Sequence, residues 1–341
     1  MKKHRIAIVT VQSASGEVGG AERFYQGLET ALNAAGTDAD IISVTSNEAD
    51  FDAIKESYLS FYDLDLSAYD GVISTKAPSY VVRHPNHICF LVHTMRVFYD
   101  LFEREFPEPW KELLDHRNLI HALDTGSLMP PRTKKVFCIG HEVHNRLLKY
   151  NGIDAEVLHM DLAFDEFRSG DFHYAFLPSR LHRWKRADLV IRAMKFVNRP
   201  VMLEIVGTGE QEAEFKQLAA DDPRILFLGR VSDQELVQLY ANALVVLFVP
   251  IREDLGFVTL EAFRSSKPVI TCTDSGEPTY FVKNEISGFI CPPDPKSIGE
   301  KIELLHDQPE TAKRMGRNGR RSIEHLSWKS VSEKLLAALG L

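Results

Sequence analysis

The sequence predicts an α/β protein of two doubly wound domains in tandem, each built on a parallel sheet. At 341 residues the chain is too long for one typical hydrophobic core. Short apolar runs rich in β-branched residues alternate with helical stretches, and the alternation starts again half-way along the chain. Continuous apolar runs fit strands covered on both faces. We expect two Rossmann-like domains facing across a cleft, with the ligand beyond the carboxyl ends of the strands.

In the first half, the run "RIAIVTV" at 5–11 is the predicted first strand. A Gly-containing loop follows it, and then a helix from about residue 20 to residue 35 that Gly36 closes. Helical stretches are expected near 97–123 and 142–150. The other predicted strands of this half are 40–45, 71–76, 88–93 and 135–140.

In the second half, a helix is expected from about Lys185 to Val197. The aperiodic stretch 162–174 is the predicted linker. The domains are therefore placed at 1–165 and 166–325, and the amphipathic helix within 326–341 is left free to pack back on the first domain. The predicted strands of this half are 174–179, 201–207, 225–229, 244–250, 268–272 and 288–292.

Composition excludes several classes of protein. The formal net charge is -8, so no global basic field draws the chain to nucleic acid, although a local basic patch stays open. The 4 cysteines are scattered without a CxxC pair, which is typical of reduced thiols in a cytoplasmic protein. No apolar run approaches the roughly 20 residues that span a bilayer. We expect a soluble protein whose membrane contact, if any, is peripheral, at the inner face.

The loop 13–24 joins the first predicted strand to the first helix. Gly19 and Gly20 allow a ligand to approach the backbone, and the helix N-terminus offers N–H groups to an anion. The order G-x-x-G-G is not GxGxxG, and the second strand ends in Thr45 and Ser46 instead of an acid. These departures weigh against a nicotinamide-dependent oxidoreductase. A tight turn without a ligand remains the alternative.

Arg180 follows a predicted strand, and Lys185 lies five residues later at a predicted helix start. Cations at a helix N-terminus oppose the macrodipole, which is easier to understand if an anion lies between them. A guanidinium fork and an ammonium point charge together suit a diphosphate. The alternative is a solvated basic face that also includes Arg183 and Arg186.

Two carboxylates, Glu253 and Glu261, flank the Gly-containing loop 254–259. An acid early in a helix is favourable by itself, which is a structural explanation for Glu261. A carboxylate only accepts hydrogen bonds, so each could bind a pair of sugar hydroxyls. The N–H groups of residues 256–259 would then face phosphates between two sugars. With Arg180 and Lys185, this pattern predicts a site for a nucleotide diphosphate sugar.

These motifs together resemble glycosyltransferase family 4, the retaining enzymes of the GT-B fold. The resemblance covers nearly the whole chain and depends on the order of several weak motifs. They are "GGAE" at 19–22, His93 in "FLVHTM", the R-x4-K pair Arg180/Lys185, the stretch 227–243, the E-x7-E pair Glu253/Glu261 and the stretch 268–295.

The chain departs from the family pattern in three places. Residues 253–256 are E-D-L-G where the family often has E-G-F-G, which affects the sugar pocket. Gly140-His141 stands for a Ser-Glu pair, and residues 275–278 are S-G-E-P instead of a GGxPE pattern. The last two departures leave the identity of the acceptor open.

The resemblance implies a role for each matching residue. Glu253 would position ring hydroxyls of the donor sugar, Arg180 and Lys185 would neutralise the diphosphate, and His93 would lie near the reacting sugar. Glu261 would hold the ribose hydroxyls. The remaining residues that the resemblance places around the donor are Gly20, Gly207, Arg230, Val231, Gly256, Phe257, Val258 and Thr259.

The expected reaction is metal-independent, retaining transfer of a hexose-type sugar from a UDP- or GDP-linked donor. No other cofactor is expected. The acceptor would be a saccharide or lipid-linked saccharide in cell-surface polysaccharide or lipopolysaccharide biosynthesis, and nucleic acid is not an expected partner. The D-x-D at Asp63–Asp65 follows a polar stretch instead of a buried strand, which argues against a metal-binding role. A non-catalytic sugar-nucleotide-binding protein on the same fold is the alternative.

Overall fold

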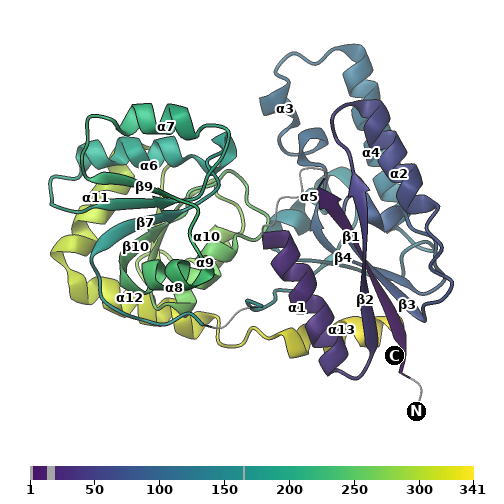
Figure 1. The fold of residues 1–341 in the computed structure, drawn as a ribbon. Helices are drawn as coiled ribbons and strands as arrows, with labels where there is room; N and C mark the ends of the chain where they lie inside the picture. The colour runs from purple at the N-terminus through teal and green to yellow at the C-terminus, as the bar shows by residue number, and fades with distance from the viewer. Residues whose placement is uncertain (1–2, 14–19, 164–165) are drawn as a thin grey trace. The chain divides into compact units, whose positions relative to one another are not determined.

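The computed structural model describes residues 3–13, 20–163 and 166–341. The chain divides into two compact units (Figure 1). The first unit consists of Met1–Ala163 with Leu326–Leu341, and the second consists of Phe164–His325.

The first unit contains a six-stranded parallel sheet with the order β2-β1-β3-β4-β5-β6. Both faces of the sheet are covered at β3, since the first five residues of this strand are all buried. The shortest strand, β6, was not predicted because two residues carry no period. The strands are β1 (Arg5–Ser13), β2 (Asp38–Ser46), β3 (Gly71–Lys76), β4 (His87–His93), β5 (Val136–Cys138) and β6 (Glu156–Val157).

The helices of the first unit include the last helix of the chain. As the sequence predicts, α1 is followed by Gly36 with a left-handed φ of 98°. The region near 97–123, where helical structure was expected, contains η2, α3 and α4, with Pro107 and Pro109 lying between the last two. The elements are α1 (Gly20–Ala34), α2 (Phe51–Tyr62), η1 (Ser79–Val81), η2 (Arg96–Phe98), α3 (Phe102–Glu105), α4 (Lys111–Leu128), α5 (His141–Asn151) and α13 (Trp328–Leu339).

The second unit contains another six-stranded parallel sheet, with the order β12-β11-β10-β7-β8-β9. All five residues of β10 are buried, as expected for a central strand covered on both faces. The six predicted runs of this half all form strands. They are β7 (Tyr174–Pro178), β8 (Leu203–Val206), β9 (Ile225–Gly229), β10 (Ala243–Leu247), β11 (Val269–Cys272) and β12 (Gly288–Cys291).

One predicted helix of the second unit is broken. Instead of a continuous helix from Lys185 to Val197, the turn η3 (Arg183–Lys185) ends at Arg186, whose φ of 53° is left-handed. The helix α6 (Ala187–Ala193) follows, and then the turn η4 (Met194–Phe196). The other helices are α7 (Glu212–Ala219), α8 (Asp233–Asn242), α9 (Phe257–Arg264), α10 (Pro278–Phe281), α11 (Pro295–Asp307) and α12 (Pro309–Ser322).

The structure agrees with the expectation of reduced cysteines. All four are buried free thiols: Cys89, Cys138, Cys272 and Cys291. Among the described residues, no helix combines the length and the apolar character that crossing a bilayer requires.

Helix α13 packs on α1 through a contact that requires a glycine. A Cβ at Gly27 would lie 2.6 Å from a ring carbon of Trp328, and the Trp328 ring lies 5.7 Å from that of Phe24. The indole therefore covers the position where another side chain would begin, and this contact joins the two ends of the chain in one unit.

We predict that Gly27→Leu destabilises the first unit by about 1–3 kcal/mol, because the added side chain displaces Trp328. Gly126→Ala is the control. Gly126 is an exposed residue of α4, and a Cβ added there would have no neighbouring atom within 4 Å, so alanine should stabilise by roughly 0.5–1 kcal/mol. Thermal and urea unfolding measure both variants. An unchanged stability of Gly27→Leu would contradict the described packing of α13.

Candidate functional site

The chemistry-bearing residues of the second unit follow the carboxyl ends of its strands. Arg180 and η3 come after β7, Gly207 comes directly after β8, and Glu253 comes in the loop between β10 and α9. Strands β10, β7 and β8 are parallel neighbours in the sheet. Their carboxyl ends therefore share one edge, and the loops that follow them are brought together there.

Lys185 and Glu253 form an ion pair across this edge. The Lys185 Nζ lies 2.6 Å from Glu253 Oε2, with the two side chains 28% and 19% exposed. The ammonium also lies 5.7 Å from the centre of the Phe248 ring. The structure thus brings together one predicted cation and one predicted carboxylate from loops 68 residues apart. Their partial burial makes the pair stronger than a surface ion pair.

Arg180 lies in more open surroundings. Its guanidinium is 3.5 Å from Glu210, and the two side chains are 51% and 67% exposed. Glu210 also lies 3.6 Å from the His182 ring, and partial burial lowers the pKa of His182. Exposed ion pairs contribute little to stability. Breaking the Arg180–Glu210 pair therefore requires little energy.

Glu261 occupies the second turn of α9 and has a partner that the sequence did not reveal. The hydroxyl of Tyr240 donates a hydrogen bond of 2.5 Å to Glu261 Oε2. Tyr240 is a fully buried residue of α8, where its ring packs on Phe176 and Phe167. From sequence the tyrosine is one more apolar position on a helix. Its hydroxyl orients the carboxylate that the resemblance assigns to the ribose.

Gly256 directly precedes α9 and has a backbone conformation that favours glycine. Its φ is 77°, and a Cβ there would lie 2.4 Å from the Phe248 ring and 3.2 Å from Glu253 Cγ. The backbone N–H of Thr259 donates to the Gly256 carbonyl at 3.0 Å, so this N–H is already used within the turn. Phe257 and Val258 start the helix, where N–H groups have no intrahelical acceptor.

Gly207 lets the loop after β8 approach the loop after β7. With a φ of 121°, its Cβ would lie 2.1 Å from the Ser179 carbonyl oxygen. Its N–H donates to the Gly229 carbonyl at 2.8 Å, which joins the ends of β8 and β9. Gly207 is thus required for packing, whatever the loop binds.

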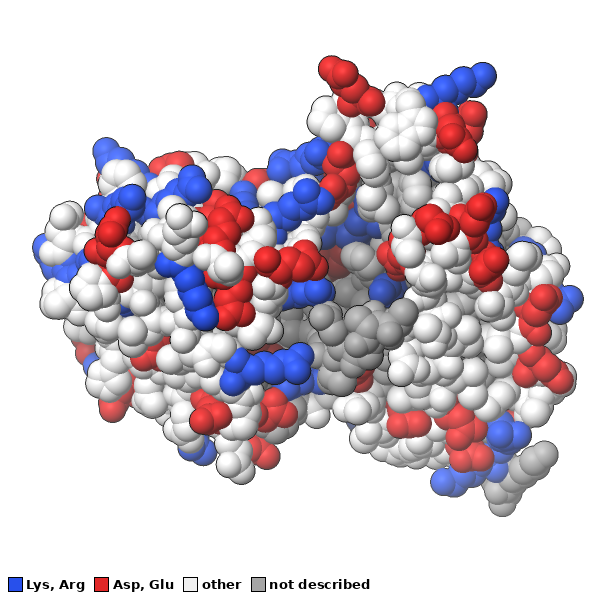
Figure 2. All heavy atoms as spheres, turned by 45° about the horizontal axis from the view of Figure 1, so that its top comes forward, with Lys and Arg blue, Asp and Glu red and all other residues white. Residues whose placement is uncertain are grey.

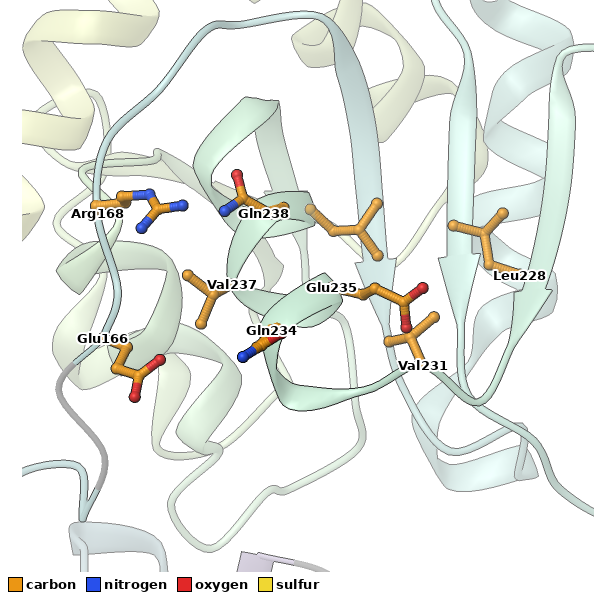
Figure 3. Close-up of a pocket in the computed structure, with 9 residues that line it drawn as sticks. Glu166, Arg168, Leu228, Val231, Gln234, Glu235, Val237 and Gln238 are labelled. Atoms are coloured by element: carbon orange, nitrogen blue, oxygen red, sulfur yellow. The ribbon is translucent and has the colours of Figure 1, made fainter.

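Arg230 and Val231 follow β9. Arg230 is exposed, and Val231 lines a pocket of about 750 Å³ in this unit. Figure 3 shows Val231 close to Glu235 of α8, with Gln234 and Gln238 on the same helix. Arg168, in the segment before β7, lines the opposite side. Val231, which the resemblance places around the donor, therefore borders a pocket lined by apolar, amide and charged side chains.

Two of the predicted residues belong to the first unit. Gly20 is the first residue of α1 and is exposed, whereas Gly19 lies outside the described residues. His93 ends β4 and is partly buried, and its carbonyl accepts a hydrogen bond of 3.0 Å from the Ala77 N–H.

Arg186 and Asp274 form a pair that sequence reasoning missed. The alternative of a solvated basic face is wrong for Arg186, because its side chain is only 13% exposed and contacts Asp274 at 2.7 Å. A non-glycine residue with a left-handed φ has no sequence signature, so the direction of this side chain could not be read from the sequence.

Lys and Arg side chains elsewhere are interspersed with acids over the face in Figure 2, in keeping with the net acidic composition.

Residues 162–322 match the family model described as glycosyl transferases group 1. Over the whole chain, the fold is similar to that of HepE from Anabaena, solved in complex with UDP and glucose. The TM-score is 0.71 at 15% identity, with 99% of each chain covered. The fold is that of the GT-B glycosyltransferases.

Two curated relatives share part of this sequence. The chain is 31% identical over 153 residues to human alpha-1,3/1,6-mannosyltransferase ALG2, covering 45% of this chain and 36% of that protein. It is 28% identical over 162 residues to the Escherichia coli O-antigen chain mannosyltransferase C, covering 46% of this chain and 43% of the relative. The matches thus span less than half the length of either relative. The finer assignment to family 4 stays a prediction.

We predict that Tyr240→Phe weakens the binding of a nucleoside diphosphate by roughly 3- to 10-fold, because Glu261 loses the donor that orients it (about 1 kcal/mol). The matched control is Tyr174→Phe, which removes a hydroxyl that donates to the Leu239 carbonyl at 3.0 Å and not to Glu261. Isothermal calorimetry with UDP and GDP measures the affinities. Equal effects of the two changes would contradict a specific role of the Tyr240 hydroxyl.

Proposed function

We propose that this protein is a retaining glycosyltransferase that moves a hexose-type sugar from a nucleotide diphosphate sugar to a saccharide or lipid-linked saccharide. The observation that carries this proposal is the Lys185–Glu253 pair at the carboxyl edge of a parallel sheet. The Tyr240–Glu261 hydrogen bond adds a second oriented carboxylate in the same unit. The glycosyltransferase names of the relatives and the UDP and glucose in the HepE structure agree with this chemistry.

The chemistry follows from where charge develops. Breaking the bond at the anomeric carbon leaves an oxocarbenium-like sugar and a diphosphate with added negative charge. Preorganised cations and N–H dipoles stabilise that charge. In this unit the cations are Lys185 and Arg180, and the N-terminus of α9 supplies the dipole.

Glu253 has two functions in this proposal. In the resting protein it holds the Lys185 ammonium at 2.6 Å, and with donor bound its oxygens accept hydrogen bonds from sugar hydroxyls. For front-face attack the leaving phosphate oxygen takes the proton of the acceptor, so no side-chain nucleophile is needed. Glu253 and Glu261 are therefore not the acid and nucleophile of a glycosidase.

The finer parts of the proposal concern donor, acceptor and setting. We propose a UDP- or GDP-linked donor, no metal ion and no other cofactor. His93 and Gly20 of the first unit are proposed to act on the sugar and the diphosphate. The proposed setting is cell-surface polysaccharide or lipopolysaccharide biosynthesis at the cytoplasmic face of the membrane. The alternative, a sugar-nucleotide-binding protein without catalysis, predicts nucleotide binding with no turnover.

We predict that Lys185→Ala and Glu253→Ala each lower kcat/KM for donor turnover by about 100-fold or more, as expected when a preorganised charge is removed. Release of nucleoside diphosphate from UDP-glucose and GDP-mannose measures this. Lys195→Ala removes an exposed lysine of η4 and is the matched control, expected to keep full activity. Full activity in Lys185→Ala would contradict its role, and binding without turnover in the wild type would favour the alternative.

A peripheral membrane contact is also proposed, on the basis of α12. This helix carries five Lys or Arg residues against one acid, in a chain of net charge -8. Arg314, Arg317 and Arg321 are spaced at i, i+3 and i+7 on its exposed face, and the opposite face is buried. Among the described residues, no carboxylate lies within 4.0 Å of these three guanidinium groups. Glu310 lies on the same face, where Lys313 and Arg317 lower its pKa.

An apolar side chain lies next to this basic face. Asn318 of α12 donates to the carbonyl of Ile286 at 3.0 Å, and Ile286 is 55% exposed. Lys283 is exposed in the same loop, as is Glu285. Arginines beside an exposed apolar group match the phosphates and acyl boundary of an anionic bilayer surface.

We predict that the triple variant Arg314→Gln/Arg317→Gln/Arg321→Gln binds phosphatidylglycerol-containing vesicles about 100-fold more weakly, at about 1 kcal/mol for each cation near the surface. The control variant changes Lys195, Lys216 and Lys296 to Gln, an equal charge change elsewhere on the second unit. Vesicle co-sedimentation at two salt concentrations measures binding. An equal loss in both variants, or binding to phosphatidylcholine alone, would contradict a specific basic face.

A further inference from the structure

We propose that Arg186 and Asp274 are positioning residues that hold the Lys185–Glu253 pair in its reactive geometry. The role of the Lys185–Glu253 pair in catalysis rests on the proposed function. The way in which Arg186 and Asp274 hold that pair rests on geometry alone. Arg186 directly follows Lys185 in the chain. Asp274 lies in the loop after β11, and its side chain is 32% exposed.

The Arg186 side chain makes four hydrogen bonds to two different loops. Its Nη1 and Nη2 donate to the two oxygens of Asp274 at 2.9 and 2.7 Å. Its Nε donates to the Val249 carbonyl at 2.6 Å, and Nη2 also donates to the Pro250 carbonyl at 2.9 Å. A bidentate, charge-assisted pair of this kind is both strong and directional. One guanidinium therefore fixes the loop after β10 and the loop after β11 relative to η3.

Backbone hydrogen bonds continue these connections to Glu253. The N–H of Arg252 donates to the Asp274 carbonyl at 2.9 Å, and the N–H of Glu253 donates to the Ser275 carbonyl at 2.8 Å. The N–H of Ile251 donates to the Trp184 carbonyl at 2.8 Å, next to Lys185. The residues before and at Glu253 are thus bonded to both neighbouring loops.

Gly276 allows the two loops to lie this close. Its φ is 78°, and a Cβ would lie 2.6 Å from the Glu253 nitrogen. The N–H of Glu277 donates to the Glu253 carbonyl at 2.9 Å, so Glu253 is hydrogen-bonded through both its backbone groups. The carboxylate that contacts Lys185 is therefore attached to a backbone with little freedom.

The backbone of Arg186 shows that this arrangement has a cost. A left-handed conformation is unfavourable for a residue with a Cβ, and glycine would adopt it without strain. The four hydrogen bonds of the guanidinium offset it, and only an arginine can make all four. A residue kept in a strained conformation beside a proposed active site fits a positioning role better than a role in stability alone.

Arg186→Gly tests the positioning role without straining the backbone. Glycine adopts a φ of 53° readily, and the substitution removes the guanidinium. Arg224→Ala is the matched control. Arg224 makes the same kind of bidentate pair with Asp222, at 2.9 and 2.7 Å, and also donates to the carbonyls of Val197 and Met194. It lies just before β9, at the amino ends of the strands, away from the proposed site.

We expect Arg186→Gly to lower kcat/KM by about 10-fold or more relative to Arg224→Ala, with a thermal unfolding temperature no lower than that of the control. Asp274→Ala should lower kcat/KM by a similar factor. The double variant Arg186→Gly/Asp274→Ala should have a kcat/KM little lower than either single variant, because the two side chains act as one unit. Millimolar guanidinium should restore part of the activity of Arg186→Gly and none of that of Lys185→Ala. Activity of Arg186→Gly within twofold of the control would overturn the proposal.

Hydrogen exchange provides a test that does not depend on turnover. In Arg186→Gly the amides of Arg252 and Glu253 should exchange about 10-fold faster than in the wild type, and they should be unchanged in Arg224→Ala. Unchanged exchange in Arg186→Gly would refute the positioning role even if the protein is an enzyme. If these amides exchange faster in Arg186→Gly but the wild type shows no donor turnover, the positioning role is supported and the proposed function is contradicted.

Discussion

A single left-handed residue determines much of the second unit's candidate site. At Arg186 the chain leaves η3 and begins α6, so Lys185 ends one element while the guanidinium of the next residue turns to the loops after β10 and β11. If the helix continued through this position, side chains at i and i+1 would point about 100° apart around one axis. The break instead allows consecutive residues to reach Glu253 and Asp274, which lie on different loops.

Close backbone contacts impose the second constraint. Gly207, Gly256 and Gly276 each have positive φ, and each has a neighbouring atom closer than 3.0 Å to the position of a Cβ. These neighbours are the Ser179 carbonyl, the Phe248 ring and the Glu253 backbone. The loops at the carboxyl edge are therefore packed against one another as tightly as a core. Charged side chains on such loops keep their geometry, which a site that stabilises developing charge requires.

The sequence predicted the elements better than their junctions. The apolar runs at 225–229 and the amphipathic pattern at 328–339 coincide with β9 and α13, because buried strands and helix faces have periods that side chains display. The break at Arg186 has no such period, and β6 is too short to show one. Backbone conformation at a non-glycine residue is decided by tertiary hydrogen bonds, so sequence patterns carry little information about it.

In the candidate site, the sequence predicted several of the charged residues but not the residues that contact them. Arg180 and Lys185 were predicted because cations at a helix start oppose the macrodipole, and Glu253 and Glu261 because they flank a Gly-containing loop. The structure brings Lys185 and Glu253 together. Their partners were not recognised. Tyr240 resembled an apolar position of a helix, Arg186 a solvated cation and Asp274 a turn residue, since each has an ordinary structural explanation when read alone.

The resting ion pairs also bear on how a donor would enter. Lys185 lies against a half-buried carboxylate, whereas Arg180 lies against an exposed one, so removing Arg180 from Glu210 requires less energy than separating Lys185 from Glu253. A diphosphate would therefore recruit Arg180 first and would share Lys185 with Glu253. Lys185 can be shared in this way because its ammonium has three N–H donors, and Glu253 accepts a hydrogen bond from one of them. The negative charge of Glu253 opposes a ground-state diphosphate nearby. In the proposed reaction Glu253 would favour the positive charge that develops on the sugar as the bond breaks, while Lys185 and Arg180 would offset the negative charge that develops on the diphosphate.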